Sequence, residues 1–168
     1  MKGVKELLKD SMKCLAQATA LLAESLDRFA QKTCSQAAAL YAHHASYDLR
    51  KLNMLLRSAI EALGFNPDEP TEDCVKAAGR LMIESLNEAL RILGSEKPDL
   101  PSLIDAGRRL VEAAMVHALA YTKAFTMLNP GYEHLAIASE AAAKDLHNHL
   151  EILEKLKPVI MRELSASV

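Results

Sequence analysis

The sequence predicts an all-α protein made of four long helices and one short helix. Apolar residues recur every three or four positions along most of the 168 residues, and no segment alternates apolar and polar residues as a β-strand does. The few glycines and prolines gather where these periodic segments stop. Because 50% of the residues are hydrophobic and 25% are charged, we expect residues 1–168 to form one domain with a full core.

The first two helices are expected to form an antiparallel hairpin. One apolar face runs through residues 4–31, with its members three and four positions apart. Thr33, followed by Gln36, resembles a capping box that would begin the second helix. This helix would run to Leu63 and stop at Gly64, because glycine readily adopts the left-handed conformation found after helix ends. Almost no linker remains between the two helices, which favours their packing side by side.

A short helix is expected in the segment that leads to the second hairpin. Thr71 is its candidate N-cap and Gly94 its end, after a proline-containing loop at residues 65–70. The fourth helix would open at Ser102, a second candidate cap, and carry apolar residues as far as Leu128.

The last helix is expected over residues 131–164. Asn129 would cap it and Pro130 would take its first position, where a missing N–H group costs nothing. Pro158 is expected to bend this helix or to end it about one turn early. Two hairpins joined by a long crossover make a ferritin-like up-down four-helix bundle with an additional short helix in the crossover. A plain array of five helices is the alternative.

Charge and composition exclude several classes of function. The formal net charge is −2, and aromatic residues make up 4% with no tryptophan, so neither a basic stripe nor a base-stacking surface for nucleic acid is indicated. No apolar run approaches the ~20 residues of a membrane span. Charges occur throughout residues 1–10, so we expect no signal peptide there and no contact with a membrane.

The cysteines favour a reducing compartment. Cys14, Cys34 and Cys74 are odd in number and form no CxxC pair, so they do not suggest a disulfide framework. We expect them to pack as small apolar side chains in the core. The cytoplasm is then the simplest location for the protein.

Two stretches of the chain resemble a known family. Residues 74–84, CVKAAGRLMIE, are similar to the short crossover helix of the YciE/YciF-type ferritin-like family (DUF892), and residues 105–121 to its third bundle helix. Residues 56–64 and the proline-containing loop after them fit the same layout. The resemblance implies a bundle that can hold a two-metal centre, with carboxylates, mostly Glu, on all four bundle helices. By analogy with such bundles it also implies a homodimer.

The sequence departs from the ligand pattern of that family. Thr19 stands where an acid is expected, and although Glu112 matches the first acid of the third bundle helix, Met115 replaces the second. Residues 141–143 of the last helix are all alanine where the pattern would allow acids. Our first hypothesis is therefore a non-enzymatic, stress-associated or scaffold protein that kept the bundle, lost the di-iron centre and holds no cofactor.

Polar residues also lie on the predicted inner faces of three helices. They are His44, Asp48, His117, Asp145 and His149. Two helices each carry an Asp/His pair four residues apart, which places both groups on one side of the helix. Since imidazoles and carboxylates bind iron, manganese and zinc, our second hypothesis is a non-standard site for metal storage or for oxygen or peroxide chemistry. Alternatively, each aspartate neutralises the histidine of its own helix, and the pairs fix the helix register.

A third hypothesis is a phosphotransfer or partner-binding bundle. Such a role needs an exposed, reactive histidine, for which His43 or His44, a turn or two from Arg50 and Lys51, is the candidate. No small-molecule substrate is indicated by any motif in the chain.

Overall fold

The computed structural model describes residues 2–71, 73–128 and 130–166, and within these ranges all regular structure is helical. The helices are α1 (Lys2–Ala30), α2 (Gln36–Ala62), α3 (Cys74–Ala78), α4 (Arg80–Leu93), α5 (Leu100–Met127) and α6 (Glu133–Ala166). The predicted all-α class is confirmed. Over the same ranges, no helix combines the length and the hydrophobicity needed to cross a bilayer.

Two helices begin at other caps than those predicted. Ser35, not Thr33, precedes α2, because the Ser35 hydroxyl accepts a hydrogen bond of 3.0 Å from the amide of Ala38. In the crossover, the carboxylate of Asp73 accepts a bond from an amide one turn further on, so Asp73 rather than Thr71 caps α3. Each correct cap lies two residues beyond the predicted one, since several hydroxyl and carboxyl side chains compete within a few positions.

The later helices also differ from the prediction at their starts. Asp99 precedes α5, and Ser102 lies in the first turn of the helix rather than at its cap. α6 begins at Glu133, so Pro130 occupies the preceding turn instead of the first helical position. The predicted cap Asn129 lies outside the described residues.

Glycine and proline act differently at two interior positions. The predicted crossover helix is in fact two helices, because Gly79 between α3 and α4 has a φ of +83°, which breaks the helix. Pro158, by contrast, does not end α6 early, since the helix continues through it to Ala166. A proline removes one hydrogen bond from a helix, and the packing of the long α6 outweighs that loss.

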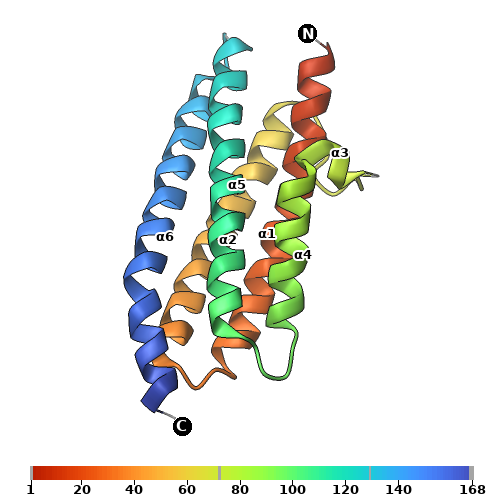
Figure 1. Ribbon diagram of the computed structural model, residues 1–168. Coiled ribbons are helices and arrows are strands. Elements are labelled where there is room, and N and C mark those ends of the chain that lie inside the picture. The colour runs from red at the N-terminus through yellow and green to blue at the C-terminus, as the bar shows by residue number, and fades with distance from the viewer. Residues whose placement is uncertain (1, 72, 129, 167–168) are drawn as a thin grey trace.

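The five longest helices surround one interior. α1 packs on α2, α2 on α6, α6 on α5, α5 on α4, and α4 on α1, which closes a ring. Figure 1 shows that α2 and α5 run in one direction, whereas α1, α4 and α6 run in the other. The core inside the ring is built from aliphatic and aromatic side chains such as Met12, Ile60 and Phe125, all of which are almost inaccessible to solvent. The ring therefore uses the crossover helix α4 as a wall between α1 and α5.

A disulfide ties the crossover to α1. Cys14 and Cys74 are bonded, with their Cα atoms 5.5 Å apart, and they are separated by 60 residues in the sequence. Cys34 is free and exposed. The prediction that all the cysteines pack as free thiols is thus wrong, because the packing of α3 against α1 places two of them in contact.

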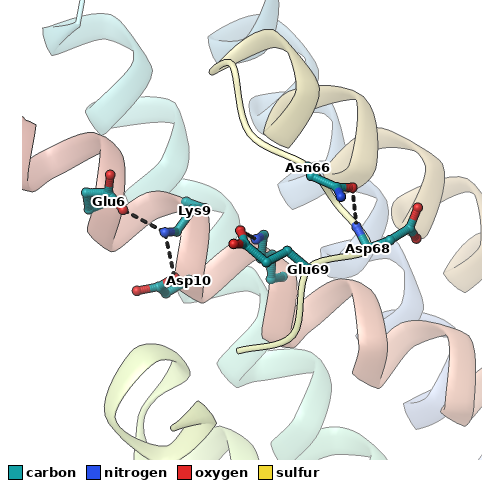
Figure 2. A network of polar contacts seen from close by, with 7 residues as sticks. Glu6, Lys9, Asp10, Asn66, Asp68 and Glu69 are labelled. Atoms are coloured by element: carbon teal, nitrogen blue, oxygen red, sulfur yellow. Dashed lines mark hydrogen bonds and ion pairs between the residues drawn. The ribbon is translucent and has the colours of Figure 1, made fainter. Parts of the chain in front are cut away.

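An ion pair fastens the loop after α2 to the same helix. Lys13 is 1% exposed, and its ammonium group donates to a carboxylate oxygen of Glu69 at 2.7 Å. Figure 2 shows Glu69 lying over α1, close to Lys9. The hydrogen bond from Lys13 lowers the pKa of Glu69. The Lys13–Glu69 ion pair and the Cys14–Cys74 disulfide together hold the segment between α2 and α4 against α1.

Candidate functional site

Two histidines and an aspartate meet where α2 packs on α6. The Nε2 atom of His149, on α6, lies 2.7 Å from Oδ2 of Asp48, and Nε2 of His44 lies 3.5 Å from the same oxygen. His44 and Asp48 are four residues apart on α2, so they face one side of that helix. The three potential ligand atoms all lie within 4.8 Å of one another. We call these three residues the His/Asp cluster.

Asp48 is the hub of the cluster. While its Oδ2 atom faces the two imidazoles, its Oδ1 atom accepts a bond of 2.7 Å from the ammonium group of Lys51. Burial alone would raise the pKa of Asp48, but the hydrogen bonds from Lys51 and His149 outweigh burial and lower it. The same bond to Asp48 raises the pKa of Lys51. Asp48 is therefore a carboxylate near neutral pH, with one oxygen turned to the imidazoles.

The cluster runs from the interior to the surface. The side chain of His149 is 8% exposed, that of Asp48 is 18% exposed and that of His44 is 48% exposed. Tyr41 lies edge-on to the ring of His149, and burial, followed by the nearby charge of Asp48, raises the pKa of its phenol. Tyr41 thus stays protonated. An ion could reach the cluster from solvent along His44.

One polar atom of the cluster has no partner. Nδ1 of His149 is buried, and no group in the described part of the chain forms a hydrogen bond with it. A buried imidazole usually satisfies both ring nitrogens, because an unmade bond costs the full desolvation of the group.

The cluster has the composition of a mononuclear metal site. Two imidazoles and one carboxylate make the 2-His-1-carboxylate set that binds iron(II), and related sets bind zinc or manganese. Three protein ligands leave coordination positions open for water or a substrate. Lys51 competes with a cation for Asp48, yet it contacts the oxygen that faces away from the imidazoles.

Two of the five predicted site residues lie apart from the cluster. Nε2 of His117 is 2.9 Å from the carbonyl oxygen of Ala78, so this histidine binds the end of α3. Asp145 is exposed, and it acts on the cluster only through its charge, which helps to raise the pKa of Lys51. Glu112, which matches an acid of the ferritin-like pattern, is also exposed. The described residues offer one group of three or more possible metal ligands, the His/Asp cluster.

A cavity of about 380 Å³ lies inside the helix ring, next to the cluster. Aliphatic and aromatic side chains line most of it, and His149, Asp48 and Tyr41 contribute to its wall.

The mouth of the cavity lies between α2 and α6. Of the residues that line the cavity, those that are exposed are Lys51 on α2 and Ala141 and Asp145 on α6. The sequence analysis did not predict the cavity, although small residues on the facing sides of α2 and α6 are compatible with one. Ala42 and Ala138 are examples, because their short side chains leave space in the wall.

Comparison of the chain with models of protein families, with curated proteins and with solved structures finds no match. The resemblance to the YciE/YciF-type family stays a prediction.

Proposed function

We propose that the protein binds one first-row transition-metal ion, iron, manganese or zinc, at His44, Asp48 and His149. The observation that carries the proposal is the convergence of three potential ligand atoms from two helices to within 4.8 Å. His149 is 101 residues from Asp48 in the sequence, so the spacing within one helix does not explain their contact. A bound ion would supply a Lewis acid with open positions, suited to metal storage or to oxygen or peroxide chemistry.

The bundle is proposed to be a ferritin-like up-down four-helix bundle. In support, α1 and α2 form one antiparallel pair, α5 and α6 form another, and α4 returns the chain between them (Figure 1). The resemblance of residues 74–84 and 105–121 to the YciE/YciF-type family points the same way. A single aspartate in the cluster supports a mononuclear site in place of the di-iron centre of that family.

A metal-free scaffold is the second candidate, and a specific contact favours it. Asp48 already accepts bonds from Lys51 and from His149, so its charge is balanced without a cation. Such a polar network between α2 and α6 would fix the register of the two helices. Under this proposal the protein is a non-enzymatic, stress-associated or scaffold bundle, as the sequence first suggested.

A role in partner binding rests on the outer face of α2. His43 and His44 have side chains that are 59% and 48% exposed, as a phosphotransfer histidine needs. Leu40, Tyr47 and Met54 are exposed and seven residues apart, so they form an apolar stripe along α2. The stripe supports the proposed homodimer, which light scattering of the purified protein would detect as a doubled mass.

The cytoplasm also remains a proposal for the location of the protein. The Cys14–Cys74 bond weighs against it, because disulfides persist mainly in oxidising compartments.

Elemental analysis tests the metal proposal. Protein purified without a polyhistidine tag or chelator is expected to contain iron, manganese or zinc near one equivalent, or to take up one equivalent of Fe(II), Mn(II) or Zn(II). His44→Ala and Asp48→Asn should each abolish stoichiometric uptake, because each removes one of three ligands. His43→Ala is the matched control, since His43 is exposed on the same helix outside the cluster, and it should bind as the parent does.

A parent protein that contains no metal and takes up none would overturn the metal proposal and leave the scaffold. Uptake that survives both ligand substitutions would place the ion elsewhere and overturn the assignment of the cluster.

A further inference from the structure

The segment that follows α2 is attached to the bundle by few buried side chains. We call residues 65–77 the strap, and Figure 1 shows its helical end, α3, at the outer side of the bundle. Among the residues of the strap that the structure describes, none is buried. The strap begins after Gly64, which has a φ of +87°, and ends at Ala78, which is 2% exposed and bonded to His117 through its carbonyl oxygen. Because buried apolar surface is the main force that holds a segment in place, the strap depends on other contacts.

The non-covalent contacts of the strap are weak. Asp68 pairs with Arg57 of α2 at 2.8 Å, but both side chains are exposed, and such ion pairs contribute little to stability. The hydroxyl oxygen of Thr71 is buried and has no hydrogen-bond partner in the described part of the chain, so the closed strap leaves a polar group unsatisfied. At five residues, α3 is too short to be stable on its own in water.

The disulfide is the strongest attachment of the strap. It joins Cys74, the first residue of α3, to Cys14 of α1. Cys14 is 3% exposed whereas Cys74 is half-buried, so a reductant in solution reaches the sulfur of Cys74 more easily. While the bond is intact, α3 cannot leave α1. Once the bond is broken, only the weak contacts remain.

The side chain of Lys13 lies beneath the strap. It is 1% exposed, yet its ammonium group donates at 2.7 Å to Glu69 of the strap, whose own side chain is 60% exposed. Figure 2 shows Glu69 lying over α1. A buried ammonium group without a partner is costly, so Lys13 needs either Glu69 or water. When the strap lifts, water must replace Glu69, and the amine becomes accessible to solvent.

We propose that the Cys14–Cys74 bond is a redox switch: a dithiol reductant that breaks it allows the strap to lift from α1 and uncovers Lys13, while the long helices stay folded. A thiolate of the reductant attacks Sγ of Cys74, and the electron pair of the S–S bond leaves with Cys14, which takes a proton. The second thiol of the reductant then displaces Cys74 as a thiol, so the reductant ends as a disulfide. The strap packs on α1 and α4, away from the His/Asp cluster, so the switch does not depend on a metal.

Hydrogen–deuterium exchange tests the movement of the strap. The full chain, with Cys34→Ser to remove the free thiol, is compared before and after reduction with dithiothreitol, without denaturant. The amides of Lys76 and Ala77 bond to Asp73 in the closed strap. Peptides that contain them should exchange at least about tenfold faster after reduction, and peptides from α2 and α6 should stay protected long after the strap has exchanged.

Acetylation by an N-hydroxysuccinimide ester tests the exposure of Lys13. In the Cys34→Ser background and without reductant, the double variant Cys14→Ser/Cys74→Ser is compared with the oxidised protein. The rate at Lys13, divided by the rate at the exposed Lys157 in the same sample, should rise at least about tenfold in the double variant.

Arg57→Gln is the matched control, because it removes a non-covalent contact of the strap and keeps the disulfide. Its Lys13 should be acetylated as slowly as that of the oxidised protein. Circular dichroism establishes that each variant is helical before it is compared.

The proposal is overturned if Lys13 is acetylated equally fast with and without the disulfide. Loss of protection in α2 and α6 at the same rate as in the strap would also overturn it, since the bond would then hold the whole fold rather than one segment. Exchange of the reduced chain needs no variant at Cys14 or Cys74, so it decides the question even if the double variant fails to fold.

Discussion

Reduction of the Cys14–Cys74 disulfide is expected to destabilise the protein strongly. The bond joins α1 to the crossover across 60 residues of sequence, and it therefore restricts the unfolded chain far more than the folded one. The chain-entropy relation for a loop of that length gives a loss of about 4 kcal/mol in the free energy of unfolding on reduction. With a urea dependence of about 2 kcal/mol per molar, the unfolding midpoint should fall by about 2 M.

The measurement is urea unfolding followed by circular dichroism, with and without a phosphine reductant. A Cys34→Ser background removes the free, exposed thiol and excludes exchange with it. In this background, Cys14 and Cys74 of the oxidised protein should resist alkylation. The double variant Cys14→Ser/Cys74→Ser should have the same urea unfolding midpoint as the reduced protein. Equal midpoints for the oxidised and reduced forms would refute the argument, as would free thiols at both positions before reduction.

Four further substitutions test contacts and backbone conformation within the fold. Tyr121→Phe removes the buried hydroxyl that bonds Ser11 at 2.6 Å, so the free energy of unfolding should fall by about 1–2 kcal/mol in urea titrations; no change would contradict that bond. Gly64→Ala forces a side chain onto a φ of +87° and should cost about 1–2 kcal/mol, whereas Gly107→Ala, inside α5 with no atom near its new Cβ, should stabilise by up to about 1 kcal/mol; a reversed order in thermal unfolding would refute the backbone argument. Because the pKa of Asp48 is lowered in the folded state, its contribution to stability is complete above the ordinary carboxyl pKa of about 3.9 and is lost as the pH falls through the folded value. The stability difference between Asp48→Asn and the parent should therefore shrink as the pH falls below about 4, and a difference that persists in acid would show that the carboxylate is not the stabilising form.

Local patterns in the sequence predict the helices well, because helix formation depends on residues a few positions apart. The apolar period of 3.6 residues predicts the position of every long helix, and Gly64 and Gly94 each follow the end of one. Caps are harder, since Thr33 and Ser35 are both capable acceptors and only the bond to Ala38 distinguishes them. Gly79 carries the same ambiguity, because a glycine within a periodic segment can continue a helix or break it.

The candidate site divides along the same line. The four-residue spacing of His44 and Asp48 is enough to place both on one face of α2, since that geometry belongs to a single helix. The contact of Asp48 with His149 depends on how α2 packs against α6. The sequence places both His149 and His117 on apolar helix faces, and only the packing shows that His149 joins the cluster whereas His117 binds the carbonyl oxygen of Ala78.

By itself, the sequence determined the all-α class and the long helices, because these follow from the period of one helix. Only the tertiary structure decided the Cys14–Cys74 bond, the convergence of the His/Asp cluster and the cavity. Each of these depends on which helices become neighbours. α4 packs between α1 and α5, and that arrangement arises from the summed packing of the whole chain rather than from any local pattern.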